Sequence, residues 1–245
     1  MVASVMSEFF ENLGRKAAPS VLRARWIYRS LTGTESERIR AEYAMGCYLT
    51  YLHTRDGKLD RTPEVIHRLN THVRHLSKAL VNRERSFQVR CVAEKEENAF
   101  ALPGGFLFVS RPLYDSFAGN DDEIAFVLAH EMGHVVRSHA FNRILTSEIA
   151  RVLSRGGPIG GALRPLVAQL VRKLVAEGYS RRQELEADRF AVRLTRAAGY
   201  RPEAGVQLFR RLDSGTRAPG GMAAFFSSHP PFPVRIQRIR KALEE

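Results

Sequence analysis

Two histidines with a glutamate between them are the residues of this sequence best suited to metal chemistry. His130 and His134 belong to the segment His-Glu-Met-Gly-His. Residues four apart on a helix share one face, so both imidazoles can bind a single ion. Glu131 then projects beside the ion, where it can take a proton from the water that zinc activates. The apolar run Ile124–Ala129 before the motif indicates a buried helix, so the sequence predicts a zinc site with Glu131 as general base.

A catalytic zinc ion usually has three protein ligands and one open position, so a third ligand is needed. In one metallopeptidase pattern, this ligand is a histidine six residues after the second histidine. That position is Phe141 here, which excludes the pattern. His139 lies five residues after His134, about 140° around a continuous helix. We therefore expect His139 to face away from the site.

A group of carboxylates further along the chain can supply the missing ligand. Glu184 and Asp188 lie four residues apart in the segment Glu-Leu-Glu-Ala-Asp, so they share a helix face. One can bind zinc, while the other accepts the outer N–H group of a ligating histidine and fixes its tautomer. Glu186 lies about 200° around the helix from Glu184, and we expect it to point away.

The elements that must position these residues are a small sheet followed by helices. Strands are predicted at 87–91, 98–102 and 106–109, the last two joined by a tight turn at Pro103–Gly105. Helices are predicted at about 35–51, 63–80, 121–153, 160–176, 180–198, 202–212 and 232–244. This order predicts an α+β fold that is mostly helical, with a small β-sheet next to the motif helix. Residues 1–34 are expected to form a basic helical arm, followed by one domain at 35–245.

Composition limits the class of protein. Charged residues make up 26% and hydrophobic residues 44% of the 245 residues, which is typical of a globular domain. We expect no membrane-spanning helix, and Met1–Phe10 lacks the features of a secretory signal. The net charge of +12 comes mostly from dispersed arginines, which indicates a solvated basic surface rather than specific nucleic-acid binding. A cytoplasmic or peripheral membrane location is therefore expected, with export left open if the start of the chain is processed.

Four motifs, in this order, resemble those of the CAAX-prenyl-protease/HtpX/BepA family of zinc metallopeptidases over roughly residues 40–245. They are Asn98–Gly105, His130–His134, Glu184–Asp188 and Ser228–Pro231. The resemblance implies a gluzincin, in which one zinc ion is bound by His130, His134 and Glu184. It also implies that Glu131 is the general base and that Asp188 supports a ligating histidine.

His229, in the segment Ser-Ser-His-Pro-Pro, has a role that the sequence leaves open. By default it is a turn residue. In BepA-like relatives the matching histidine approaches the zinc ion, so the resemblance implies a role in the site. The residue is then either a fourth ligand that keeps the enzyme latent or a donor to the oxyanion of the transition state.

The hairpin before the metal motif is expected to bind substrate. Metallopeptidases of this kind commonly hold substrate as an extra strand through main-chain hydrogen bonds. The candidate edge consists of Asn98, Ala99, Phe100 and Ala101, as the resemblance also implies, and its small alanines would let a peptide backbone approach. The alternative is an inner strand that is packed on both sides. Gly133 is expected to permit close packing of this strand on the helix.

The resemblance implies a zinc-dependent endopeptidase of unfolded or misfolded proteins, closest to the BepA-like branch that is linked to protein quality control. The chain differs from BepA in that we find neither a signal sequence nor a tetratricopeptide tail. The alternative function is a latent, chaperone-like zinc protein that captures extended polypeptide without cleaving it. Residues 1–31, with a charge of +3, offer a peripheral contact with anionic membranes. The oligomeric state is not predicted.

Overall fold

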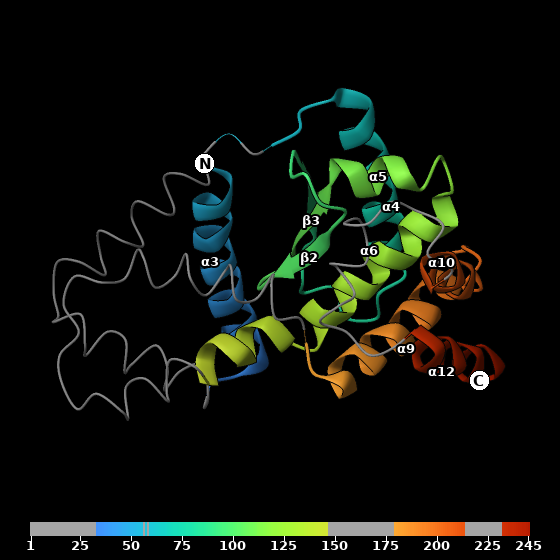
Figure 1. The fold of residues 1–245 in the computed structure, drawn as a ribbon. Helices are drawn as coiled ribbons and strands as arrows, with labels where there is room; N and C mark the ends of the chain where they lie inside the picture. Colours follow the sequence, from blue (N-terminus) through green and yellow to red (C-terminus); the bar gives the residue numbers. More distant parts are fainter. Residues whose placement is uncertain (1–32, 56, 58, 147–178, 214–231) are drawn as a thin grey trace, which may run out of the picture.

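The structure is a computed structural model that describes residues 33–55, 57, 59–146, 179–213 and 232–245 (Figure 1). The predicted basic arm therefore lies almost wholly outside the described residues. His229 and the predicted helix at 160–176 lie wholly outside the described residues. The division of the chain at residue 34 stays a prediction.

The described elements confirm the predicted α+β class, since strands occupy one short stretch of a mostly helical chain. The described helices are α3 (Glu35–Thr54), α4 (Pro63–Lys78), α5 (Arg111–Ser116), α6 (Asp121–Val136), α9 (Arg181–Ala197), α10 (Ala204–Asp213) and α12 (Phe232–Glu244). The described strands are β1 (Gln88–Val92), β2 (Ala99–Leu102) and β3 (Phe106–Ser110).

The strands among the described residues form a single sheet in the order β1-β3-β2. β3 runs parallel to β1 and antiparallel to β2. The predicted hairpin is confirmed, with Ala99 paired to Val109. Its turn contains Gly104 and Gly105 with φ angles of 78° and 95°, a conformation that suits glycine. As far as the described strands extend, β2 therefore lies at one edge of the sheet.

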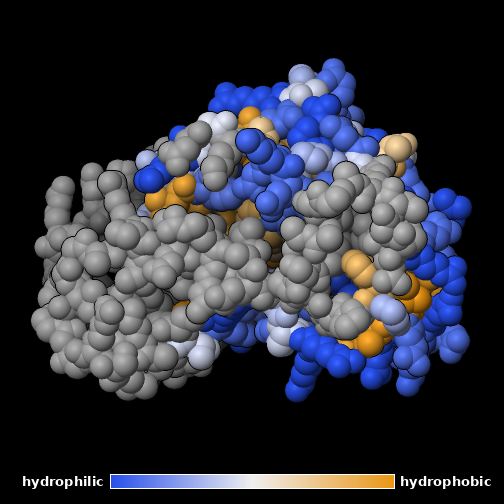
Figure 2. Space-filling view, in the orientation of Figure 1, coloured by the Kyte–Doolittle hydropathy of each residue, from blue (hydrophilic) through white to orange (hydrophobic). Residues whose placement is uncertain are grey.

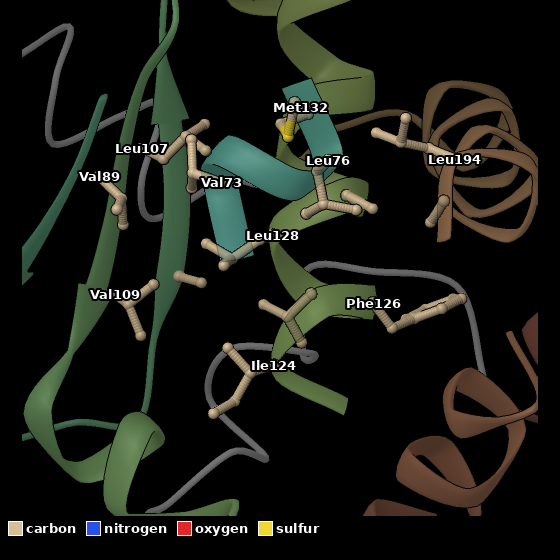
Figure 3. Packing of buried hydrophobic residues seen from close by; sticks show 14 of the residues in the cluster. Val73, Leu76, Val89, Leu107, Val109, Ile124, Phe126, Leu128, Met132 and Leu194 are labelled. Carbon is tan, nitrogen blue, oxygen red and sulfur yellow. The ribbon is translucent and has the colours of Figure 1, made fainter. Parts of the chain in front are cut away.

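Helix α6 is the central element of the fold. Every residue from Glu123 to Val135 is buried, and the helix packs against α4, β2, α9 and α10 (Figure 1). The core side chains around it come from these elements and the neighbouring strands, and include Val73, Leu76, Val89, Leu107, Val109 and Leu194 (Figure 3). Burial on several sides explains why the sequence before the metal motif is apolar throughout rather than along one stripe.

The predicted helix 121–153 is interrupted, because α6 ends at Val136. Ser138 has a φ angle of 54°, in the left-handed region that stops a right-handed helix, and helical structure resumes at 139–146. Ser138 Oγ donates a hydrogen bond to Glu42 Oε1 at 2.6 Å and accepts one from Arg85 Nη2 at 3.1 Å. Arg85 also forms an ion pair with Glu42. Because both partners come from distant parts of the chain, the local sequence does not reveal the break.

Helix α9 packs closely on α6 at Gly133. A Cβ atom on this glycine would lie 3.2 Å from Ala187 Cα and 3.1 Å from Phe190 Cδ1. The expectation that Gly133 makes room for a strand is therefore wrong, since its close neighbours belong to α9. The missing side chain lets the two helices that carry the predicted zinc ligands approach each other.

The described surface is largely hydrophilic. Among the described residues, the exposed large hydrophobic side chains are those of Tyr51, Ile66 and Val81. Among the residues that Figure 2 colours by hydropathy, most are hydrophilic, with a few hydrophobic areas between them. Within the part of the chain that the structure describes, none of the helices combines the length and the hydrophobicity needed to span a bilayer.

The variant Gly133→Val tests the importance of this close helix approach. The added side chain meets the backbone of Ala187, so we expect the free energy of unfolding to fall by about 1–3 kcal/mol. Urea denaturation followed by circular dichroism measures the loss. Gln207→Val, at an exposed position of α10, controls for placing a branched residue in a helix. Equal losses in the two variants would contradict the prediction.

Candidate metal centre

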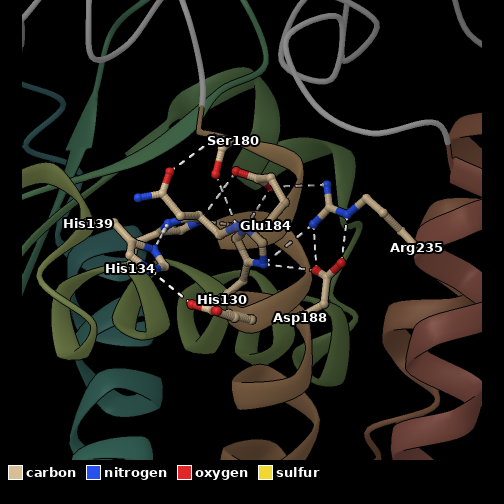
Figure 4. A network of polar contacts seen from close by, with 9 residues as sticks. His130, His134, His139, Ser180, Glu184, Asp188 and Arg235 are labelled. Atoms are coloured by element: carbon tan, nitrogen blue, oxygen red, sulfur yellow. Dashed lines mark hydrogen bonds and ion pairs between the residues drawn. The ribbon is translucent and has the colours of Figure 1, made fainter. Parts of the chain in front are cut away.

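Three side chains from two helices converge at one point inside the fold (Figure 4). His130 Nε2 and His134 Nε2, both on α6, lie 3.1 Å apart. Glu184 of α9 places Oε2 at 3.5 Å from His130 Nε2 and Oε1 at 3.5 Å from His134 Nε2. All three side chains are buried. The structure thus brings together the three residues that the sequence singles out as zinc ligands.

The spacing of these atoms fits a single zinc ion. Bonds from zinc to nitrogen and oxygen are about 2.0–2.2 Å long, so the ligand atoms of a tetrahedral ion lie roughly 3.3–3.6 Å apart. The observed separations are 3.1 Å between the imidazoles and 3.5 Å from each imidazole to the carboxylate. Two imidazoles and one carboxylate also form a donor set of known catalytic zinc sites.

Local sequence explains how each ligand reaches this point. The two histidines lie one turn apart on the buried helix α6, so their side chains project in the same direction. Glu184 lies in the first turn of α9, where the positive end of the helix dipole favours a carboxylate. Ser180 begins that turn with a capping box, in which its side chain accepts from the Gln183 N–H group.

Asp188 contacts the outer nitrogen of one histidine, as predicted for a residue that fixes a tautomer. Its Oδ1 atom lies 3.0 Å from His130 Nδ1, which leaves Nε2 directed at Glu184 and His134. Burial lowers the pKa of His130, but hydrogen bonds to Asp188 and Glu184 outweigh this effect and raise it to about 9. The surroundings therefore favour positive charge at this imidazole, which a metal cation at Nε2 supplies.

Glu131 lies on α6 between the two histidines and is buried, with 3% of its surface exposed. Its carboxylate accepts a hydrogen bond from the backbone of Ala101 in β2. Burial and the charge of Glu184 raise the pKa of Glu131 to about 7, against the opposing effects of His130 and Arg235. A pKa near 7 suits a group that must accept and return a proton at neutral pH.

Comparison with known proteins identifies the family. The profile of peptidase family M48 matches residues 63–243. The chain belongs to peptidase family M48. This membership confirms the resemblance that the four sequence motifs indicate.

Relatives of this M48 chain include proteins from bacteria and mitochondria. Metalloprotease LoiP of Escherichia coli is 34% identical over 151 residues, which cover 60% of this chain and 58% of LoiP. Mitochondrial metalloendopeptidase OMA1 of Schizosaccharomyces pombe is 32% identical over 163 residues, or 65% of this chain and 47% of OMA1. The beta-barrel assembly-enhancing protease of Escherichia coli is 24% identical over 178 residues, or 66% of this chain and 35% of that protein. The chain thus spans about half the length of the first two relatives.

Arg235 of α12 is a member of the site that sequence reasoning missed. Its Nε and Nη2 atoms donate to the two oxygens of Asp188 at 2.8 and 2.6 Å, and Nη1 lies 3.7 Å from Glu184 Oε2. The side chain is 1% exposed. The sequence does contain a signal for this role, because Arg235 shares a helix face with Ile239 and Ala242, the other buried residues of α12. A basic residue on an apolar helix face indicates a buried acidic partner.

The expectation that His139 faces away from the site is wrong. His139 Nδ1 lies 2.9 Å from His134 Nδ1, because the break after Val136 ends the continuous helix on which the expected rotation depends. Glu186 is not part of the ligand cluster, as expected. Its Oε2 atom nevertheless lies 3.5 Å from His139 Nε2. Burial lowers the pKa of His139 against the opposing effect of Glu186, which favours a neutral imidazole beside His134.

Tyr179, directly before the first turn of α9, also contacts the site without having been predicted. Its ring stacks on the imidazole of His134, with centroids 3.8 Å apart and an interplanar angle of 16°. A single aromatic residue before a helix gives no sequence signal for this contact.

The predicted substrate residues lie in and just before the edge strand β2. Ala99 and Ala101 belong to the core cluster around α6, whereas Phe100 stacks on Phe108 on the other face of the sheet. The strand is therefore packed on both faces, as the alternative expected, but it lies at an edge of the described sheet and is not an inner strand. The role of Asn98–Ala101 in substrate binding stays a prediction, and so does that of His229, which lies outside the described residues.

Replacing Arg235 by methionine tests the buried ion pair. The change leaves the carboxylate of Asp188 without its guanidinium partner, so we expect the free energy of unfolding to fall by about 3–5 kcal/mol. Urea denaturation of the metal-free protein measures this loss. The double variant Arg235→Met with Asp188→Asn should lose less than the sum of the two single variants, because the carboxylate that Arg235 binds through two hydrogen bonds is then uncharged. A loss below about 1 kcal/mol in Arg235→Met would contradict the prediction.

Proposed function

We propose that this chain is a zinc-dependent endopeptidase that binds one zinc ion through His130, His134 and Glu184. The observation that carries the proposal is the buried carboxylate of Glu131 on the helix that also presents both imidazoles. Membership of family M48 supports it, as do the relatives named as metalloproteases and metalloendopeptidases. A zinc ion held by these residues supplies a Lewis acid that acidifies water and polarises the scissile carbonyl group.

The surrounding side chains transfer the proton and hold the ligating residues in position. Glu131 accepts the proton of the attacking water at its carboxylate. Because burial raises its pKa, the same carboxyl group can hold the proton and return it to the departing amine. Asp188 keeps His130 in the tautomer whose Nε2 faces the site, and Arg235 in turn holds Asp188 with two hydrogen bonds.

The edge of β2 supports an extended polypeptide as substrate. Asn98 O accepts from the Ser110 N–H group, so the alternating pattern of an antiparallel pair directs the backbone groups of Ala99 and Ala101 away from β3. The N–H group of Ala101 donates to Glu131, so Ala101 offers a peptide its carbonyl group. A peptide added as a strand at this edge therefore passes the general base, and only unfolded or locally extended segments can bind in this way. We propose unfolded or misfolded proteins as the substrate class.

The names of two relatives agree with a role in proteolysis. One is a protease that enhances beta-barrel assembly, and another is a mitochondrial metalloendopeptidase. For this chain, a role in protein quality control is part of the proposal. Latency through His229 and membrane contact through residues 1–31 remain sequence predictions, since both lie outside the described residues.

Glu131→Gln separates metal binding from catalysis. Glutamine keeps the shape of the side chain but cannot accept the proton, so casein hydrolysis should fall by at least about 100-fold. Elemental analysis should still find one zinc ion per chain in this variant. The control is Glu64→Gln at an exposed position of α4, which should leave both quantities unchanged.

Two results would contradict the proposal. Retained hydrolysis in Glu131→Gln would remove the assigned base. A zinc-loaded wild-type protein that binds casein without cleaving it would instead favour the chaperone-like alternative.

A further inference from the structure

Both ring nitrogens of His134 have polar neighbours, and the neighbour of its Nδ1 atom differs in kind from that of His130 Nδ1. Its Nε2 atom faces His130 and Glu184, at 3.1 and 3.5 Å. Its Nδ1 atom lies 2.9 Å from Nδ1 of His139. At His130 the corresponding atom, Nδ1, faces the carboxylate of Asp188 at 3.0 Å instead. The outer nitrogen of the second histidine thus has an imidazole as its described neighbour (Figure 4).

The contact continues beyond His139. Its second nitrogen, Nε2, lies 3.5 Å from Glu186 Oε2. His139 is 5% exposed, whereas Glu186 lies at the surface end of the chain of contacts and also accepts from Arg182 Nε at 2.9 Å. A continuous row of polar groups therefore runs from His134 through His139 to a carboxylate on α9.

The backbone break after α6 is what places His139 in this row. Ser138 adopts its left-handed conformation with φ of 54°, and its hydroxyl group is held between Glu42 and Arg85 at 2.6 and 3.1 Å. Glu42 is fully buried. The polar cluster under the break thus fixes the direction in which the His139 side chain leaves the backbone.

We propose that His139 and Glu186 are positioning residues of the metal centre, which fix the tautomer and orientation of His134 as Asp188 does for His130. The inference rests on the proposed function, because it takes His134 as a zinc ligand. A histidine that binds zinc through Nε2 carries its proton on Nδ1. That N–H group donates to His139 Nδ1, so the proton of His139 lies on Nε2 and is directed at Glu186.

The proposal assigns a separate task to each acidic residue of the segment Glu184–Asp188. Glu184 faces both ligating nitrogens, Asp188 supports His130, and Glu186 supports His134 through His139. Replacing a group that holds a metal-ligating histidine in this way typically weakens metal binding about 10- to 100-fold.

The first test compares two replacements of His139 in the full chain. The dissociation constant for Zn²⁺ is measured by competition with a chromogenic chelator. His139→Leu removes the acceptor, so zinc should bind about 10- to 100-fold more weakly. His139→Asn keeps a carbonyl acceptor near the position of Nδ1 and should recover most of the affinity. His67→Leu, at an exposed position of α4, controls for the loss of an imidazole and should bind zinc as the wild type does.

The second test uses the exposed end of the row, where folding is less at risk. Glu186→Ala removes the partner of His139 and should weaken zinc binding, by less than His139→Leu. Arg182→Ala is the matched control, because it removes the contact between Arg182 and Glu186 and leaves Glu186 facing His139. The absorption spectrum of the Co²⁺-loaded proteins should shift in His139→Leu and Glu186→Ala only, since it reports ligand geometry rather than stability.

The outcomes separate this inference from the proposed function. Wild-type zinc affinity and cobalt spectra in both His139→Leu and Glu186→Ala would overturn the inference and leave the zinc site intact. Equal weakening in His139→Asn and His139→Leu would also overturn it, because the acceptor would then be irrelevant. Unchanged zinc binding in His134→Ala would instead overturn the proposed function.

Discussion

The close packing of α9 on α6 is the constraint on which the metal centre depends. Glu184 lies at least 50 residues after the two histidines in the sequence. The packing of these two helices brings it next to them. Gly133 on α6 faces Ala187 on α9, and Ala187 and Ala191 are fully buried. Small residues at this contact let the helix backbones come close enough for a carboxylate to reach two imidazoles. The positions of the ligands are thus a consequence of core packing.

The same packing gathers negative charge among the described residues of the metal centre. The carboxylates of Glu131, Glu184 and Asp188 are all buried, and Arg235 is the buried cation whose charge acts on all of them. Buried charge without compensation costs several kcal/mol per ion. Burial and the charge of Glu184 raise the pKa of Glu131, and hydrogen bonds to Asp188 and Glu184 raise the pKa of His130 against the effect of burial. A divalent cation bound by these residues would offset this negative charge, so we expect metal binding and folding stability to be coupled in this chain.

The sequence predicted those features of the fold and site that depend on local patterns. The spacing of His130 and His134 defines one helix face, and the spacing of Glu184 and Asp188 defines another. The alternation around the Pro103–Gly105 turn likewise indicated the β2–β3 hairpin, which the structure confirms. Each of these patterns needs only neighbouring residues and regular geometry.

The features that escaped prediction depend on contacts between distant segments. The break at Ser138 results from Glu42 and Arg85, which the chain supplies from 96 and 53 residues away. Without that break, the rotation expected for His139 would be correct. Arg235 contacts Asp188 across 47 residues. Tertiary contacts of this kind override local periodicity, and they occur here within and beside the metal centre.

Anomalous diffraction at the zinc absorption edge, from crystals of the zinc-loaded protein, would show directly which side chains bind the ion. We expect one peak per chain, at about 2.0–2.2 Å from His130 Nε2, His134 Nε2 and an oxygen of Glu184. A zinc peak bound to other side chains, with these three left out of its coordination, would contradict this expectation.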